Sequence, residues 1–314
     1  MSANLRKIIA IDCGKMNLKA TDGKKEVIYT NKFSNNYESE AILGKNTFNV
    51  CYENFKYTIG NGATKHERKE GKDSDFHIIS ALTAVTKFIT PTDASVRLIY
   101  GESIDMYYNK DHKNNLKSKL LGKQKIVVNE IEYEFNIESV LILPEGVGHV
   151  LCDMSKYSGI QHVVDIGGGT INFLSVSDGS PKKEESFSVP MGIHNLVTKI
   201  KTECKRKKLG TINDETLSSF LTKGSPNEKI QKVIDDVAKE HFNQFNDEVA
   251  SHGVDIENLF TLSFTGGGSE TLKEIVQKIY PNASIVSDCL LANVKGFCMY
   301  GKSKYNSWEC EISD

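Results

Sequence analysis

The chain has 314 residues, of which 25% are charged and 39% hydrophobic, as in an ordinary soluble globular protein of about two domains. The formal net charge of −2 excludes a general electrostatic attraction to nucleic acid or anionic lipid. The seven cysteines are scattered and form no CxxC pair, which argues against a zinc ribbon or a redox motif and favours a reduced, cytoplasmic setting. The apolar run at residues 8–11 is too short for a signal-peptide core or a membrane span.

In the first half, apolar or alternating runs predict strands at residues 7–11, 18–20, 26–30, 48–51, 57–59, 95–100, 124–128, 131–137 and 139–143. Asp22-Gly23 is expected to be a hairpin turn. The densely charged segment 65–75 is expected to be an exposed loop, followed by an amphipathic helix over 76–89 that ends at Thr90-Pro91. Residues 105–121 have weak helical character, and Pro144 to Gly146 should open a helix over 147–157.

In the second half, strands are expected at residues 163–166, 173–177, 183–189, 259–264 and 284–286. Helices are expected at residues 193–208, 213–221, 226–250, 269–279 and 288–300. Ser269 is the expected N-cap of the fourth of these helices.

The stretch 163–172 is the most informative, because an apolar strand runs into Asp165, then Gly167, Gly168 and Gly169, then Thr170. Consecutive glycines allow successive backbone N–H groups to point inward and form an anion-binding nest. A carboxylate at the strand end can hold a metal directly or through water. The alternative is a β-hairpin turn with an incidental acid.

A strand, an Asp-Xaa-Gly turn and a hairpin occur at residues 7–30 and again at 163–189. We interpret this as a weak internal duplication, whose two halves would place both acidic turns on one cleft. In the first copy Gly14 allows the turn, and Asn17 and Lys19 can reach an anion from the hairpin. Lys19 could instead be a solvated surface charge.

A third glycine turn, formed by Gly266, Gly267 and Gly268, follows the strand predicted at 259–264. A nucleotide's base or ribose can lie against glycines because they lack side chains. The alternative is a plain connection between a strand and a helix.

The joint occurrence of these turns, with Pro144-Glu145-Gly146 between the first two, resembles the actin/Hsp70/sugar-kinase ATPase superfamily. The pieces correspond to its phosphate-1, connect-1, phosphate-2 and adenosine motifs, and 292–296 to connect-2, so that the resemblance covers nearly the whole chain. A Walker-type NTPase is disfavoured because no GxxxxGK(S/T) occurs. Within the superfamily the chain is most similar to the ParM-like plasmid-segregation actins. The reasons are its actin-like size, the lack of the amphipathic N-terminal membrane helix common in MreB-like proteins, and the segment 57–63.

The resemblance implies an α/β, actin-like fold, which is a duplicated ribonuclease H-like fold with two domains around a nucleotide cleft. Domain I would span residues 1–155, with the C-terminal helix 288–314 packing back onto it. Domain II would span 156–287 and include a helical subdomain at about 195–258.

The resemblance also implies that Mg²⁺ and ATP, or GTP, bind in the cleft, with Asp12 and Asp165 holding the ion largely through water. Lys19 would neutralise developing charge, and Glu145 would orient the attacking water, although it could simply be a carboxylate favoured at a helix start. The phosphates would be cradled by residues of the first two glycine turns, namely Gly14, Asn17, Gly167, Gly168, Gly169 and Thr170. The purine side would include the third glycine turn with Glu203 and Lys207.

In this superfamily the ParM-like members assemble into filaments, so the resemblance implies an ATPase that polymerises and moves plasmid DNA bound by a ParR-like centromere-binding adaptor. A small-molecule kinase of the same fold and a nucleotide-sensing scaffold without turnover stay open as alternatives. The basic run 199–208 could bind nucleic acid, but its spacing fits a solvated helix face better. Asn172 departs from the family pattern, because many relatives carry an acid there. Cys13 lies at a position that varies in the family, and we interpret it as a small buried filler rather than a redox-sensitive residue.

Overall fold

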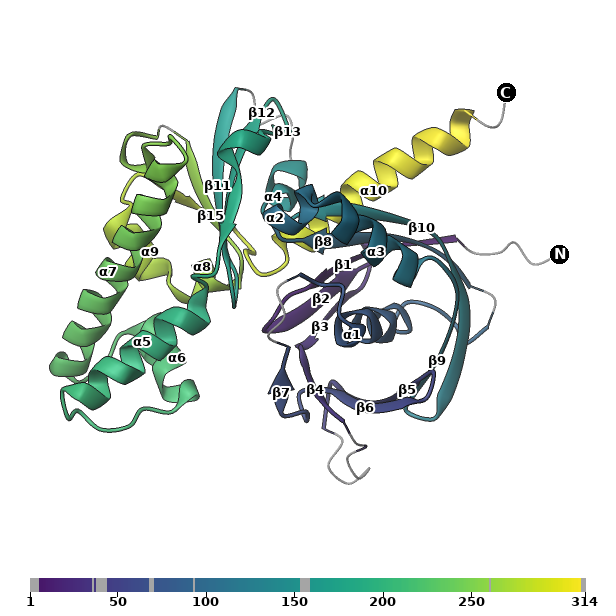
Figure 1. Cartoon of the computed structure of the whole chain (residues 1–314), viewed down its shortest axis with the longest axis horizontal. Coiled ribbons are helices and arrows are strands. Elements are labelled where there is room, and N and C mark those ends of the chain that lie inside the picture. Colours follow the sequence, from purple (N-terminus) through teal and green to yellow (C-terminus); the bar gives the residue numbers. More distant parts are fainter. Residues whose placement is uncertain are drawn as a thin grey trace. The chain divides into compact units, whose positions relative to one another are not determined.

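The computed structural model describes residues 6–35, 37, 44–67, 71–92, 94–152, 159–259 and 261–311. The chain divides into two compact units, 1–152 with 293–314 (unit 1) and 153–292 (unit 2), each of which is described by itself (Figure 1). The domain limits predicted from the sequence, residues 155 and 287, differ from these by a few residues and stay a prediction.

Unit 1 is built on a ten-stranded sheet of order β3-β2-β1-β8-β10-β9-β5-β6-β4-β7. Its strands are β1 (Arg6–Cys13), β2 (Asn17–Thr21), β3 (Glu26–Thr30), β4 (Lys32–Ser34), β5 (Thr47–Tyr52), β6 (Phe55–Gly60), β7 (Lys65–His66), β8 (Ala94–Glu102), β9 (Gly122–Val128) and β10 (Ile131–Pro144). The central strand β8 pairs in parallel with both β1 and β10, and the other pairings are antiparallel. The carboxyl ends of these three strands therefore meet at one edge of the sheet.

The sheet curls around helix α1 (Asp75–Val85), as Figure 1 shows. Every residue of this helix from Phe76 to Val85 is buried, so the expected amphipathic helix over 76–89 was wrong in both character and length. The helix is buried nearly all round because the curled sheet covers it on several sides, and its polar residues His77, Ser80 and Thr83 are enclosed with the apolar ones. Its N-cap Ser74 accepts a hydrogen bond from the His77 N–H at 3.4 Å.

The expected exposed loop over 65–75 was also wrong. It begins with strand β7, and further along both Lys72 and Asp73 are buried. The strands expected separately at 131–137 and 139–143 form the single strand β10, with a register shift between Ile137 and Ser139.

Unit 1 also contains α2 (Ile104–Tyr108), α3 (Lys110–Leu120), α4 (Val147–Cys152) and α10 (Ala292–Glu311). The helix expected over 147–157 ends at Cys152 among the described residues, because 153–158 lie outside them. A Cβ at Gly296 of α10 would overlap the carbonyl oxygen of Gly148 in α4. The last helix therefore passes α4 closely at these two glycines.

Unit 2 is built on a sheet of order β13-β12-β11-β15-β16, with β14 also pairing with β12. Its strands are β11 (Ile160–Ile166), β12 (Ile171–Ser177), β13 (Ser180–Pro181), β14 (Phe187–Val189), β15 (Leu262–Thr265) and β16 (Ser284–Ile285). The strand expected over 183–189 is a 3₁₀ turn, η3 (Lys183–Glu185), followed by the short β14. As in unit 1, an antiparallel hairpin (β11-β12) lies beside a parallel strand (β15), in line with the predicted duplication.

The helices of unit 2 are α5 (Ile193–Arg206), α6 (Asp214–Lys223), α7 (Glu228–Ser251), α8 (Gly267–Thr271) and α9 (Lys273–Ile279), with a 3₁₀ turn η4 (Ile256–Asn258). Long helix α7 buries an apolar stripe, with Ile230, Val233, Ile234 and Phe242 buried and Val237 partly buried. The helix expected over 269–279 is two short helices, and Ser269 is not its cap. The N-cap is Gly266, and the buried Ser269 hydroxyl donates to the Thr265 carbonyl instead.

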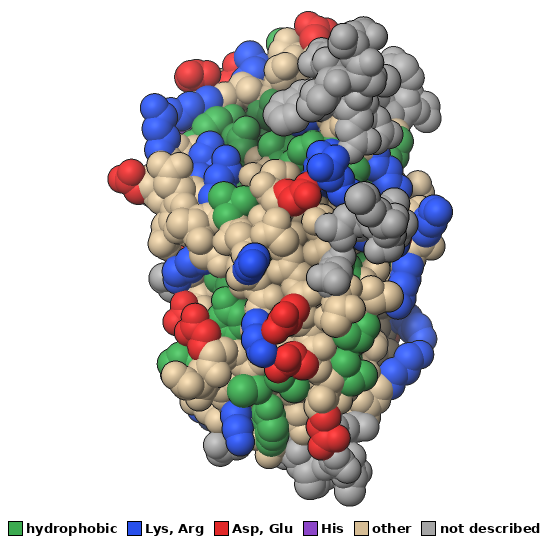
Figure 2. Space-filling view, turned by 90° about the vertical axis from the view of Figure 1, so that its right-hand side faces the viewer, with side chains coloured by type: hydrophobic (Ala, Val, Ile, Leu, Met, Phe, Trp, Pro, Cys, Tyr) green, Lys and Arg blue, Asp and Glu red, His purple; other side chains and the backbone are tan. Residues whose placement is uncertain are grey.

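Acidic and basic side chains are interspersed on the face shown in Figure 2, without a large field of one sign. This agrees with the small net charge. Within the described ranges, no helix has both the length and the apolar character needed to cross a bilayer.

Candidate functional site

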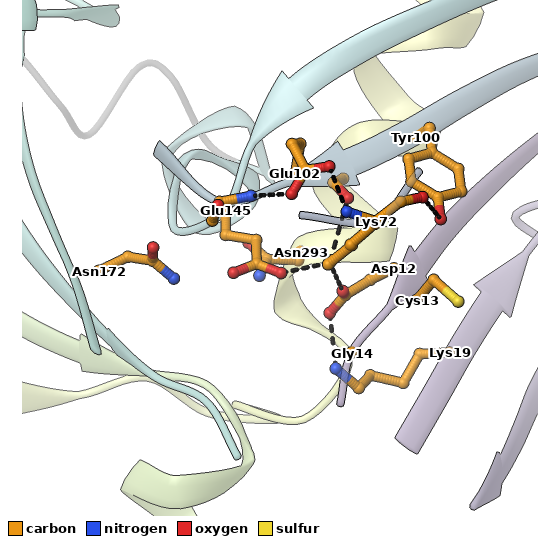
Figure 3. Close-up of polar contacts among 12 residues, drawn as sticks. Asp12, Cys13, Gly14, Lys19, Lys72, Tyr100, Glu102, Glu145, Asn172 and Asn293 are labelled. Atoms are coloured by element: carbon orange, nitrogen blue, oxygen red, sulfur yellow. Dashed lines mark hydrogen bonds and ion pairs between the residues drawn. The ribbon is translucent and has the colours of Figure 1, made fainter. Parts of the chain in front are cut away.

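The carboxyl ends of β1, β8 and β10 bring three acidic residues to one edge of the unit 1 sheet. Asp12 on β1 is paired with Gly101 on β8, and Glu102 on β8 is paired with Pro144, which immediately precedes Glu145. All three acids are buried, with Glu102 completely enclosed. Their carboxylates therefore need cations or N–H donors close by (Figure 3).

Two lysines flank the carboxylate of Asp12. Lys19 Nζ lies 2.6 Å from Oδ2 and Lys72 Nζ lies 2.8 Å from Oδ1 (Figure 3). Burial alone would raise the pKa of Asp12, but the charges of Lys19 and Lys72 outweigh it and lower that pKa well below its usual range. Lys19 is thus a partner of Asp12 with a 13% exposed side chain, and the alternative of a solvated surface charge is wrong.

The ammonium of Lys72 also contacts Glu145 Oε1 and donates to the Gly101 carbonyl at 3.1 Å. Burial alone would lower the pKa of Lys72, but Asp12, Glu145 and Glu102 raise it well above its usual value. Sequence reasoning missed this lysine because it lies in a run of charged residues that reads as a loop. The signal that could have found it is Ser74, since an N-cap directly before an apolar helix places the preceding residues near the core.

Glu102 was missed as well, because the strand was expected to end at residue 100. Its carboxylate accepts hydrogen bonds from the Lys72 N–H at 3.0 Å, the Ser103 N–H at 2.8 Å and His112 Nε2 at 2.8 Å. Glu102 therefore holds the main chain of Lys72 in place, whereas Asp12 and Glu145 hold its side chain.

The main chain is held at Glu145 and at the residue that follows it. Its N–H donates to the Glu102 carbonyl at 2.8 Å, and the N–H of the next residue, Gly146, donates to Asn293 Oδ1 at 3.0 Å. Gly146 has φ +85°, a conformation that favours glycine and turns the chain sharply into α4. The carboxylate of Glu145 points to Lys72, so its environment is more than the start of a helix (Figure 3).

The turn after β1 has its carbonyls tied back into the protein. The Gly14 carbonyl accepts from Asn31 Nδ2, the Lys15 carbonyl from His66 Nδ1 and the Met16 carbonyl from the Asn31 N–H, each at 2.8 Å. In a trans peptide the N–H points away from the carbonyl that precedes it. The N–H groups of Lys15 and Met16 therefore face the other way, and within the described ranges no protein acceptor is found for them.

The turn after β11 has the same construction. The carbonyls of Gly167, Gly168 and Gly169 accept from the first N–H groups of α5 and its cap, those of Ile193 at 3.0 Å, His194 at 3.0 Å and Gly192 at 3.2 Å. By the same geometry, the N–H groups of Gly168, Gly169 and Thr170 face away. Across the residues that the structure describes, these three N–H groups have no protein acceptor.

This arrangement corrects one predicted donor. The N–H of Gly167 closes the turn by donating to the Thr170 carbonyl at 2.9 Å, so it is not available to an anion. Thr170 supplies an N–H in its place. In the first turn a Cβ at Gly14 would lie 2.9 Å from the Asn17 carbonyl oxygen, so the predicted need for glycine there is confirmed.

The two hairpins place corresponding residues opposite their acids. Lys19 lies opposite Asp12 on β2, and Asn172 lies opposite Asp165 on β12. The Asn172 Oδ1 accepts a hydrogen bond from Ser188 Oγ at 2.6 Å. Position 172 is therefore a buried, anchored amide.

The third glycine turn packs against the second. A Cβ at Gly266 would overlap Asp165 Oδ1, and one at Gly268 would overlap Ile166. Protein packing therefore requires glycine at these two positions, and the contact of this turn with a nucleotide stays a prediction. Among the described residues, a Cβ at Gly267 would have one close neighbour, the Leu290 side chain at 3.1 Å. Beside this turn Thr265 Oγ1 is buried and has no hydrogen-bond partner in the described part of the chain.

Glu203 and Lys207 lie at the end of α5. Glu203 accepts two hydrogen bonds of 2.7 Å from Arg206 and lies 3.4 Å from Lys207 Nζ. The hydrogen bonds from Arg206 lower the pKa of Glu203 to about 2. Earlier in the same helix, Lys199 donates to Gln244, and Lys201 contacts Asp214. These pairings support a solvated, charge-paired face over a nucleic-acid surface.

A divalent ion fits the acidic edge of unit 1 only in part. In the described residues no group of three or more His, Cys, Asp or Glu side chains could hold a metal. Asp12 and Glu145 both reach the ammonium of Lys72, so two carboxylate oxygens converge on one point. Hard oxygen ligands suit Mg²⁺, which keeps several waters and commonly binds through one or two carboxylates and a phosphate. The Lys72 ammonium occupies that point, so these residues fit Mg²⁺ only where water and phosphate oxygens link the ion to the carboxylates.

Cys13 follows Asp12 and is completely buried. Burial raises the pKa of its thiol to about 11, and its Sγ lies 3.7 Å from the His77 carbonyl. This supports the interpretation of Cys13 as a small buried filler.

Two family models match the chain. The N-terminal domain of actin-like proteins matches residues 10–148, and the C-terminal domain of archaeal, MreB-like actin homologues matches residues 163–278. The chain belongs to the actin-like proteins. The comparison of this actin-like protein with curated proteins found no match.

Solved structures give the same fold. The archaeal actin homologue Ta0583 is 16% identical, with a TM-score of 0.78 over 95% of this chain and 99% of that one, and its ADP complex gives 0.72 over the same shares. A 15-stranded ParM filament from Clostridium botulinum is 18% identical, with a TM-score of 0.75 over 95% of this chain and all of that one. The expected fold class and the expected likeness to ParM are thus confirmed at the level of fold.

Proposed function

We propose that this actin-like protein binds Mg-ATP, or Mg-GTP, hydrolyses it and couples hydrolysis to assembly into filaments. The observation that carries the proposal is the shared construction of the two turns after β1 and β11. In each, carbonyls are tied back so that a row of N–H groups is turned away from the protein beside a buried aspartate. Such rows bind anionic oxygen atoms, and we assign them the phosphates of the nucleotide.

Each residue then has a defined part. The N–H groups of Lys15, Met16, Gly168, Gly169 and Thr170 would bind phosphate oxygens, as backbone donors do in other anion nests. Mg²⁺, when bound, would neutralise phosphate charge, held largely through water by Asp12 and Asp165. Lys19 is held against Asp12. From there its positive charge would attract a phosphate oxygen nearby. Glu145 would orient the attacking water and accept its proton.

Two relatives support the nucleotide and the filament. A structure of the archaeal homologue is a complex with ADP, and the ParM structure is a filament. We therefore propose that nucleotide binding promotes a head-to-tail contact, which builds an open filament rather than a closed ring. In a ParM-like role the filament would move plasmid DNA through a ParR-like adaptor, since the paired basic side chains of α5 leave little charge for DNA itself.

The cytoplasm is the proposed location. Among the described cysteines, Cys13, Cys51, Cys204, Cys289 and Cys298 are free thiols, in line with a reducing compartment.

Phosphate release from ATP by Glu145→Gln tests the catalytic part. We expect unchanged nucleotide affinity and turnover reduced by about a hundredfold, within the range for loss of a general base. Glu138→Gln is the matched control, because Glu138 lies on β10, the strand that directly precedes Glu145, but pairs at the surface with Arg6 and Arg97. Equal turnover in both variants would remove Glu145 from the mechanism.

Sedimentation tests the filament. We expect the protein to pellet with ATP and to stay in the supernatant with ADP. A monomer with every nucleotide would refute assembly, and ATP consumption that depends on an added sugar would favour a small-molecule kinase instead.

A further inference from the structure

The ammonium of Lys72 is saturated by oxygen acceptors. Its three protons can all be used at once, because Nζ contacts Asp12 Oδ1 at 2.8 Å, Gly101 O at 3.1 Å and Glu145 Oε1 (Figure 3). The side chain is 9% exposed. A lysine buried to this extent is stable only when its charge is compensated in place.

The main chain of Lys72 is fixed as firmly as its side chain. Its N–H donates to Glu102 Oε2 at 3.0 Å, and its carbonyl accepts from the Tyr100 hydroxyl at 3.2 Å. Both partners are completely buried on β8, and Glu102 is itself held by His112. The position of the ammonium is therefore built into the fold.

The ammonium occupies a point where oxygen atoms from two carboxylates and one carbonyl converge. This is the oxygen-rich environment that a small hard cation would take. The charge of Lys72 repels a second cation from that point, and it compensates Asp12 and Glu145, which would otherwise repel one another. Asp12 has a further cation in Lys19, whose contact is with its other oxygen, Oδ2.

We infer that Lys72 is a positioning residue: a tethered cation that sets the carboxylates of Asp12 and Glu145 and excludes bare divalent metal. The inference rests on the proposed function in one respect: the proposed binding of a nucleotide is the reason for keeping bare metal out of this site. Metal would then enter together with the phosphates of the nucleotide and not ahead of them.

The test is the binding of Mn²⁺ alone to the full-length protein without nucleotide, followed by the electron paramagnetic resonance signal of free Mn²⁺. Wild type should bind Mn²⁺ in the millimolar range or more weakly. Lys72→Met leaves two carboxylates facing one vacated point, so its Mn²⁺ affinity should rise at least about tenfold. Lys72→Arg keeps the charge and should stay close to wild type.

Lys125→Met is the matched control. Lys125 also lies between two carboxylates, those of Glu132 at 2.9 Å and Glu134 at 3.1 Å, but on the surface, with 61% of its side chain exposed. Because solvent screens these charges, Lys125→Met should change Mn²⁺ affinity less than about twofold. Lys72→Gln provides a second neutral variant if Lys72→Met does not fold, as judged by circular dichroism.

Micromolar Mn²⁺ binding by wild type, or no gain of affinity in a folded neutral variant at 72, would overturn the inference. The outcome is separable from the proposed function, because Mn²⁺ binding needs no nucleotide. If no variant binds nucleotide but Mn²⁺ affinity rises as expected, the proposed function fails and the role of Lys72 stands. If nucleotide binds and Mn²⁺ affinity does not change, the proposed role of Lys72 fails and the proposed nucleotide binding stands.

Discussion

Replacing Asn31 by alanine should loosen the turn after β1, and the cost can be worked out from its contacts. The side chain is 1% exposed; its Nδ2 donates to the Gly14 carbonyl at 2.8 Å and its Oδ1 accepts from Ser80 Oγ at 2.7 Å. Asn31→Ala leaves both groups without that partner. A buried polar group left unpaired costs about 1–3 kcal/mol, and water can reach the partly buried Gly14 carbonyl, so we expect a loss of about 2–4 kcal/mol.

Urea unfolding measures this loss, with hydrogen exchange of peptides from β1 and α1 reporting on unit 1, because two units need not unfold together. The matched control is Asn61→Ala. Asn61 also makes two side-chain hydrogen bonds, to the Thr30 N–H at 3.1 Å and the Lys45 carbonyl at 3.2 Å, but it is exposed. Its replacement should cost less than about 1 kcal/mol.

Nucleotide affinity gives a second readout of the same change. The Asn31 N–H still holds the Met16 carbonyl in Asn31→Ala, so the turn should persist but bind nucleotide several times more weakly. If Asn31→Ala and Asn61→Ala were equally stable and bound nucleotide equally, the reasoning that Asn31 orients the turn would be refuted.

Three further changes follow from packing and burial. Gly296→Ala should destabilise unit 1 by about 3 kcal/mol, measured by urea unfolding, because its Cβ would overlap the Gly148 carbonyl. Burial lowers the pKa of His241 to about 4, and the charge of Lys199 contributes. As the pH falls, this histidine therefore takes up a proton in unfolded chains before it does so in folded ones. Stability that is complete above pH ~6.5 should therefore fall by about 3 kcal/mol towards pH ~4, and His241→Gln should reduce this slope. Native Cys13 should resist iodoacetamide at pH ~8, at which partly exposed Cys51 reacts, as peptide mapping would show.

Each of these has an outcome that would contradict it. Gly44→Ala is the control for packing, since no described residue lies within 4 Å of a Cβ there, and equal stability of the two alanine variants would remove the steric argument. An acid transition of unchanged steepness in His241→Gln would exclude that histidine as its cause. Alkylation of native Cys13 as fast as Cys51 would show that its thiol is accessible.

The features predicted best from the sequence are those with local causes. The hairpins of β1-β2 and β11-β12, the strand-end acids Asp12 and Asp165 and the glycine turns after them are encoded by residues within a few positions of one another. A turn that needs glycine, such as the one at Gly14, shows directly in the sequence because no other residue type fits it.

Features created by long-range packing could not be predicted in this way. Lys72 lies 60 positions from Asp12 and 73 from Glu145, and it looked like part of a solvated loop until the curled sheet enclosed it. Helix α1 looked amphipathic because the sheet that covers it comes from distant segments. Glycine at 266 and 268 was explained only by ligand contact, but Asp165 and Ile166, about 100 residues away, also leave no room for a side chain there, and only the fold shows that packing.

The central claim is tested most directly by equilibrium binding of labelled ATP to the purified chain with Mg²⁺. The account predicts one nucleotide per chain, with affinity reduced at least about tenfold by Asp12→Ala and by Asp165→Ala, since each removes a buried charge beside a phosphate-binding turn. Absence of ATP and GTP binding at millimolar concentration in a folded wild-type protein would contradict it.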